Sequence, residues 1–173
     1  QGLGDEVMFA TCFPELQERL ARGELGSVTI ECTDRLRALF ERSFPDFRFF
    51  DRIRKQEQRL HPADYAAIVR ERGCTHEIAA GSLPKFFRPD HARFPETLVI
   101  LKPAPDKVAH WRGWLSDQGA SPWIGLSWRS RAKRDLGAVY YPGPGNLGPI
   151  LAIPGARFVT LQYDDDPEEL GRI

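Results

Sequence analysis

The sequence lacks the features that would assign it at once to a binding class. Its 173 residues carry no net charge, because 24 lysines and arginines balance 24 aspartates and glutamates. This balance argues against a general nucleic-acid-binding or membrane-surface protein. No run approaches the roughly 18 apolar residues that span a bilayer, and no signal peptide opens the chain. We therefore expect no membrane span and no nucleic-acid partner.

Cysteine is also scarce, and the spacing of the cysteines does not indicate disulfide bonds. The three cysteines, Cys12, Cys32 and Cys74, are odd in number, widely spaced and in no C-x-x-C motif. This usage favours reduced thiols and a cytoplasmic location, although a fragment of a longer chain would hide its targeting signals. The remaining composition, 42% hydrophobic and 28% charged, is that of an ordinary soluble protein with one core or two small lobes.

The most informative segment is Gly2-Leu3-Gly4-Asp5-Glu6, which leads into an apolar-periodic stretch from Val7 to Leu20. Glycines allow a tight turn and a close approach to a ligand. The N-terminus of the following helix would offer N–H groups to an anion. A carboxylate at the mouth of such a turn can act as a base. The segment therefore predicts a strand-to-helix loop of an α/β fold, with Asp5 at its mouth.

The next elements predict a parallel sheet with helices on its faces. Val28–Cys32 alternates as a strand does, Asp34 can cap a helix that ends before Pro45, and Phe47–Phe49 reads as the next strand. Helix and strand in alternation are typical of α/β proteins.

Further along, the pattern predicts several more elements and a boundary at Ser121-Pro122. The expected helices are 62–70, a short one after Gly81 that includes Phe86 and Phe87, one from Pro105 to Gly119, and 146–153; the expected strands are 76–80, 123–128 and 157–162.

Several segments, in order along nearly the whole chain, resemble bacterial glycosyltransferase-like proteins that are often fused to tetratricopeptide repeats. These segments are 2–10, 30–32, 81–84, 124–130, 140–142 and 157–163. Such proteins are distant relatives of heptosyltransferases and O-linked N-acetylglucosamine transferases, which share the two-lobed GT-B architecture. The resemblance implies two Rossmann-like lobes, residues 1–119 on the acceptor side and residues 120–173 as a truncated beginning of the nucleotide-sugar lobe.

The resemblance gives Asp5 the position of the general base that acts on the acceptor hydroxyl, with Gly2 and Gly4 beside it. An inverting transfer needs a carboxylate on the far side of the anomeric carbon from the leaving diphosphate. The alternative is that Asp5 caps the helix that follows it. Glu6 is interpreted mainly as a residue that complements the helix dipole.

The second candidate constellation is Ser127-Trp128-Arg129-Ser130-Arg131-Ala132-Lys133-Arg134. Hydroxyls and cations in a loop after a strand suit a diphosphate, because they donate hydrogen bonds and offset charge on the leaving group. The resemblance makes this the first loop of the donor lobe, with Ser127, Arg129, Lys133 and Arg134 as binding residues. A solvated charge run remains the alternative. The spacing between this loop and Tyr140 differs from that of the family, so Lys133 and Arg134 are weaker candidates for binding than Arg129.

Two other motifs have simpler explanations. The G-x-G-x-x-G match at 143–148 contains Pro144, which lacks the N–H that a pyrophosphate cradle needs. Asp164-Asp165-Asp166 precedes Pro167 and suits a helix N-terminus better than a metal site.

The sequence therefore predicts metal-independent glycosyl transfer without a cofactor, from a nucleotide-diphosphate sugar to an unknown glycan or protein acceptor. A truncated or inactive binding or scaffold domain is the alternative.

Overall fold

A computed structural model of the chain describes residues 2–52, 62–96, 100–119, 122–129, 143–162 and 167–171. The fold is α/β, as predicted, and forms two compact units, Gln1–Lys107 and Val108–Ile173. Among the described residues, each unit contains one pair of parallel strands. The division falls inside helix α6 (Pro105–Asp117), earlier than the boundary after residue 119 that the sequence suggested.

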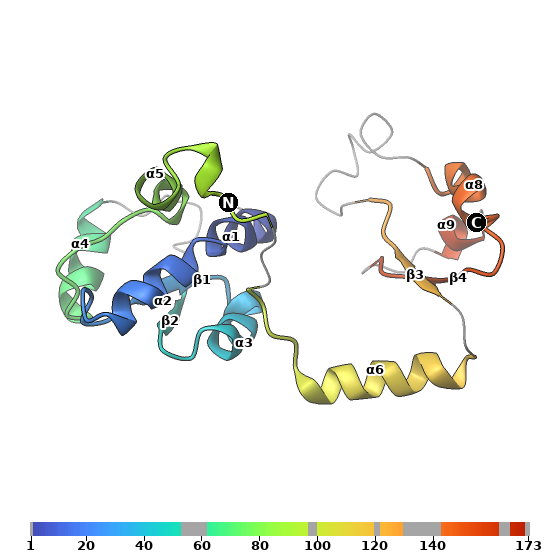
Figure 1. The fold of residues 1–173 in the computed structure, drawn as a ribbon, viewed down its shortest axis with the longest axis horizontal. Helices are drawn as coiled ribbons and strands as arrows, with labels where there is room; N and C mark the ends of the chain where they lie inside the picture. Colours follow the sequence, from blue (N-terminus) through green and yellow to red (C-terminus); the bar gives the residue numbers. More distant parts are fainter. Residues whose placement is uncertain are drawn as a thin grey trace. The chain divides into compact units, whose positions relative to one another are not determined.

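The first unit is built around strands β1 (Thr29–Cys32) and β2 (Arg48–Asp51), which helix α3 (Asp34–Ser43) connects. The strands pair in parallel, with Ile30 opposite Phe49 and Cys32 opposite Asp51. The predicted strand–helix–strand order is confirmed. Figure 1 shows this pair of strands close to α2 and α3.

Phenylalanines form the centre of the first unit's core. Phe13 packs edge-on against three other rings, with centroid distances of 5.9 Å to Phe40, 5.2 Å to Phe44 and 6.0 Å to Phe47. Phe40 is only 1% exposed, so nearly its whole side chain is removed from water. This cluster joins the N-terminal helices to α3 and β2 through apolar contact.

The N-terminal segment differs from the predicted continuous helix. It forms two helices, α1 (Leu3–Ala10) and α2 (Phe13–Ala21), separated by Thr11 and Cys12. Pro14 accounts for the break, because proline cannot donate the helical hydrogen bond and its ring clashes with the carbonyl four residues earlier. α2 ends near Gly23, whose positive φ of 73° permits the turn.

The middle of the first unit is helical. It contains α4 (Pro62–Glu71), a 3-10 turn at Ala80–Ser82 (η1), α5 (Leu83–Phe87) and a second 3-10 turn at His91–Arg93 (η2). The predicted helices at 62–70 and after Gly81 are confirmed. The predicted strand at 76–80 is wrong: Ile78 is 50% exposed, and these residues pair with neither described strand of this unit.

In the second unit, β3 (Trp123–Leu126) pairs in parallel with β4 (Arg157–Thr160). Between them the described chain forms a 3-10 turn, η4 (Pro144–Leu147), and the short helix α8 (Gly148–Leu151); α9 (Pro167–Leu170) follows β4. The predicted strands at 123–128 and 157–162 are confirmed in their first four residues. Figure 1 shows β3 and β4 side by side with α8 and α9 nearby.

The environments of the cysteines predict a sharp difference in thiol reactivity. Cys12 and Cys32 are buried, whereas Cys74 is half-buried. Burial, with a smaller contribution from the Glu6 charge, raises the pKa of Cys32 from 9.0 to about 11, and burial also raises the pKa of Cys12. At pH 8 a thiol of pKa 11 is thiolate in about one molecule in a thousand.

We therefore expect Ellman's reagent to label Cys74 first in the native protein and to reach the other two thiols only in denaturant. A Cys74→Ser variant is expected to show no rapid phase. Rapid native labelling of that variant would contradict the buried positions of Cys12 and Cys32.

Candidate functional site

Polar residues gather where the two strands of the first unit end. Thr33 and Asp34 directly follow β1, Asp51 is the last residue of β2, and Arg52 follows it. These four residues line a hollow of about 290 Å³. The carboxyl ends of parallel strands are where α/β proteins gather their ligands. This edge is therefore the candidate site of the first unit.

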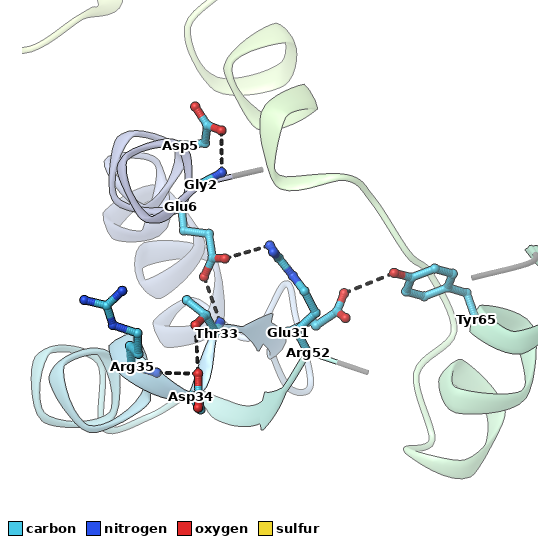
Figure 2. A network of polar contacts seen from close by, with 9 residues as sticks. All are labelled: Gly2, Asp5, Glu6, Glu31, Thr33, Asp34, Arg35, Arg52 and Tyr65. Carbon is cyan, nitrogen blue, oxygen red and sulfur yellow. Dashed lines mark hydrogen bonds and ion pairs between the residues drawn. The ribbon is translucent and has the colours of Figure 1, made fainter. Parts of the chain in front are cut away.

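Glu6 connects this edge to helix α1. Its Oε2 accepts a hydrogen bond from the backbone N–H of Thr33 at 2.8 Å, and its Oε1 lies 2.6 Å from Nη2 of Arg52. The Glu6 side chain is only 9% exposed. Figure 2 shows both carboxylate oxygens of Glu6 directed at these two partners. One side chain thus fixes the start of α3 and the residue after β2.

The two aspartates of the hollow are held by their own neighbours. Asp34 Oδ1 accepts hydrogen bonds from the Thr33 hydroxyl at 3.0 Å and from the Arg35 N–H at 2.9 Å. Asp51 Oδ1 lies 3.1 Å from Nη1 of Arg37 on α3. Arginines therefore offset part of the negative charge at this edge, and the carboxylates keep defined positions.

A second polar pair lies beside Arg52. The Tyr65 hydroxyl of α4 donates a hydrogen bond to Oε2 of Glu31 on β1, at 3.4 Å. Burial raises the pKa of the Tyr65 phenol, and the Glu31 charge raises it further, while Arg52 lowers it. In Figure 2 the residues Glu6, Arg52, Glu31 and Tyr65 follow one another across the unit.

The structure corrects the prediction of a strand-to-helix loop at the start of the chain. Gly4, Asp5 and Glu6 lie in the first turns of α1, and Gly2 is its N-cap. The Gly2 N–H donates to Asp5 Oδ2 at 2.8 Å, so Asp5 acts as the helix-capping residue that the alternative interpretation described. Figure 2 shows the Asp5 carboxylate directed away from the partners of Glu6.

Neither glycine of that segment is required by the described packing. A Cβ atom added to Gly2 or to Gly4 would meet nothing within 4 Å. The roles predicted for Gly2, Gly4 and Asp5 in ligand binding stay predictions.

In the second unit, the predicted donor loop follows β3 and is held by one side chain. Gln162 Oε1 accepts from the Ser127 hydroxyl at 3.3 Å and from the N–H groups of Trp128 and Arg129 at 3.3 and 3.4 Å. Gln162 Nε2 donates to the Arg129 carbonyl at 3.1 Å. Ser127 and Arg129 therefore lie together at the carboxyl ends of β3 and β4. Lys133, Arg134, Tyr140 and Asp164 lie outside the described residues.

The sequence predicts no functional role for most of the residues at the first site. Thr33, Asp51 and Arg52 did have a signal, because each is a polar residue at or just after the end of a strand. The sequence predicts Asp34 only as a helix cap and Gln162 only as the last residue of a strand. The sequence predicts that Glu6 complements the helix dipole, whereas the structure places its side chain in the polar network.

Within the part of the chain that the structure describes, the histidines, cysteines and acidic residues form no group that suits a metal ion. None of the helices in that part of the chain is both long and apolar enough to cross a membrane.

Comparison with known proteins finds a relative over most of this chain. Protein FlbA of Caulobacter vibrioides (strain ATCC 19089 / CIP 103742 / CB 15) is 36% identical over 173 residues, covering 98% of this chain. The chain spans only 28% of the length of FlbA. No protein-family model matches the sequence, and no solved structure matches it.

Proposed function

We propose that this chain is part of a glycosyltransferase-like protein of GT-B type, with Rossmann-like units that bind an acceptor and a nucleotide-diphosphate sugar. The first unit would take the hydroxyl-bearing acceptor and the second unit the donor. The observation that carries this proposal is the polar hollow at the carboxyl edge of β1 and β2. Parallel strand pairs in both units support it, because ligands of α/β folds gather at such edges.

The charges around the hollow favour a ligand that donates hydrogen bonds. Asp34 and Asp51 line it, and Glu6 pairs with its arginine, Arg52. A carboxylate next to an acceptor hydroxyl can remove its proton during transfer. The lining aspartates, Asp34 and Asp51, therefore join Asp5 as candidates for the base.

The second unit offers the complementary chemistry. The Ser127 hydroxyl and the N–H groups of Trp128 and Arg129 converge on one oxygen atom, that of the Gln162 amide. Converging donors of this kind also suit a phosphate oxygen. Arg129 adds a cation that would offset the charge of a leaving diphosphate.

A binding or scaffold domain without catalysis is the second candidate. It is favoured by the position of Asp5, whose carboxylate accepts the Gly2 N–H and thereby caps helix α1. The small share of FlbA that the chain spans is also compatible with it.

Calorimetric titration of the chain with UDP, GDP, ADP and dTDP tests the donor half of the proposal. We expect one of these to bind and Arg129→Ala to weaken its affinity by roughly tenfold or more, the effect of losing a charged hydrogen bond. Arg112→Ala, at an exposed position of α6, is the matched control. Absence of binding to all four nucleotides would contradict the donor site.

A second measurement separates an enzyme from a binding domain. Release of nucleoside diphosphate from nucleotide sugars is expected from an enzyme and not from a scaffold. Gly4→Ala introduces no clash and favours helix α1 by about 0.5–1 kcal/mol. Loss of turnover in this folded variant would indicate that a ligand approaches the backbone at Gly4.

A further inference from the structure

One neutral side chain occupies the position at which the donors of the loop after β3 converge. The carboxamide oxygen of Gln162 accepts a hydrogen bond from the Ser127 hydroxyl at 3.3 Å. The same oxygen accepts from the N–H groups of Trp128 and Arg129 at 3.3 and 3.4 Å. An amide oxygen has only two lone pairs, and N–H···O bonds are usually about 2.9–3.0 Å long. Three donors therefore share one acceptor at long range, so each of these bonds is weak.

Other contacts also hold the backbone of this loop. The parallel pairing continues by one residue beyond β4, where the Leu161 N–H donates to the Leu126 carbonyl at 2.7 Å. The Trp128 side chain is only 6% exposed. A short ladder bond and a buried indole thus fix the chain on either side of Ser127. The longer bonds of Gln162, at 3.1–3.4 Å, are not needed to set the course of the loop.

The Gln162 side chain can leave this position while its main chain stays in place. The Gln162 N–H donates to the Thr160 hydroxyl at 3.1 Å, which holds the backbone next to the end of β4. Gln162 is half-buried and Ser127 is exposed, so the donors lie next to solvent. Rotation about its side-chain bonds would carry the carboxamide into water, which replaces the hydrogen bonds that are lost. The volume that it vacates lies in front of the three donors.

The chemistry of that vacated position favours an anion. Two backbone N–H groups and a hydroxyl donate into it, and Arg129 adds a positive charge to the same loop. Hydrogen bonds to an ionised acceptor are shorter and about twice as strong as neutral ones. A phosphate oxygen therefore satisfies these donors better than the neutral amide oxygen of Gln162 does.

We propose that the Gln162 carboxamide is a placeholder for a phosphate group of the donor, and that Gln162 thereby sets the affinity of the second unit for phosphorylated ligands. On binding, a phosphate oxygen takes over the three hydrogen bonds and the Gln162 side chain turns out to solvent. The occupied fraction of the site lowers the apparent affinity. This inference rests on the proposed function in one respect, the assignment of the donor to the second unit. It adds that a ligand must displace Gln162.

Calorimetric titration with inorganic pyrophosphate and with the four nucleoside diphosphates tests the placeholder. Gln162→Ala removes the competing carboxamide, so we expect it to bind pyrophosphate roughly five- to tenfold more tightly, the gain for a site that is otherwise occupied about 80–90% of the time. Gln162→Glu keeps the shape and places a carboxylate on the donors, so binding should weaken by roughly tenfold or more. Gln118→Ala and Gln118→Glu are the matched controls, because Gln118 is an exposed glutamine of the same unit.

The side-chain amide of Gln162 gives an independent readout by NMR. Its ¹H–¹⁵N signals are assigned by their loss in Gln162→Ala. We expect saturating pyrophosphate to move them to the chemical shifts of a solvent-exposed glutamine. The backbone amide signals of Trp128 and Arg129 should move downfield, because their hydrogen bonds become shorter. Unchanged Gln162 signals, while those of Trp128 and Arg129 shift, would overturn the proposal.

The titrations can overturn the placeholder in three further ways. Pyrophosphate affinity that falls or stays the same in Gln162→Ala would show that Gln162 positions the loop instead of competing with the ligand. A gain that Gln118→Ala reproduces would not originate at the loop. Absence of pyrophosphate binding in both the unaltered chain and Gln162→Ala would show that the donors accept no phosphate.

The nucleotides separate this inference from the proposed function. Tighter pyrophosphate binding by Gln162→Ala, without binding of any nucleoside diphosphate to either form, would support the placeholder and contradict the donor site of a transferase. A nucleoside diphosphate that binds the unaltered chain but binds no more tightly to Gln162→Ala would contradict the placeholder and leave the donor site supported.

Discussion

Replacing Arg88 by methionine is expected to lower the free energy of unfolding by about 3–5 kcal/mol, the usual effect of breaking a buried ion pair. The Arg88 side chain is 4% exposed, and its Nε lies 2.6 Å from Oε1 of Glu15. Its two Nη atoms donate to the hydroxyl and the carbonyl of Thr11. Methionine preserves much of the volume but leaves Glu15 without its cation. Urea unfolding followed by circular dichroism measures the change.

Two further variants make the Arg88 prediction specific. Arg93→Met removes an exposed arginine that lies 3.6 Å from Asp90, and we expect a loss below about 1 kcal/mol. Combining Arg88→Met with Glu15→Leu is expected to recover part of the lost stability, because no charge is then left behind. A loss of less than 1 kcal/mol for Arg88→Met alone would show that the pair does not hold α2 to the end of α5.

Replacing Glu6 by alanine is expected to cost about 2–3 kcal/mol, because hydrogen bonds to charged groups contribute about 1.5–3 kcal/mol each and part of that is screened. The substitution leaves the Thr33 N–H and the Arg52 guanidinium without their carboxylate. Glu6→Gln keeps an acceptor for Thr33 and should lose less. The same urea experiment measures both, and chemical shifts of Thr33 and Asp34 report whether the hollow changes shape.

The neighbouring aspartate provides the control for Glu6. Asp5→Ala removes one capping hydrogen bond at the exposed start of α1, with an expected cost of about 1 kcal/mol. Equal losses in Glu6→Ala and Asp5→Ala would contradict the assignment of Glu6, rather than Asp5, to the network at the strand ends.

The elements that the sequence predicts best are those with local causes. Alternation in Val28–Cys32, the cap predicted at Asp34 and Pro45 after α3 define the β1–α3–β2 unit within about twenty residues of chain; the structure moves the N-cap by one residue, to Thr33. The break between α1 and α2 also has a local cause, Pro14, but the helical spacing of Phe9, Phe13 and Leu16 hides it. The strand predicted at 76–80 fails because short apolar runs become strands only beside a partner strand.

The candidate site is harder to predict because its contacts are long-range. Glu6 meets Thr33 across 27 positions and Arg52 across 46. Whether Asp5 or Glu6 faces the sheet depends on where α1 begins, and a shift of one residue turns a helical side chain by about 100°. Reading Gly2–Glu6 as a loop therefore placed Asp5 at the predicted site. Only the rule that polar residues after strands mark ligand edges would have found Thr33 and Arg52.

The bond from the Thr33 N–H to Glu6 also bears on selectivity. Thr33 is the N-cap of α3, and the N-terminus of a helix carries partial positive charge that attracts anions. In this chain the Glu6 carboxylate occupies that position and serves as a built-in counter-ion. A phosphate that approached the start of α3 would have to displace a covalently attached competitor of the same sign. We therefore expect the start of α3 to disfavour anionic ligands.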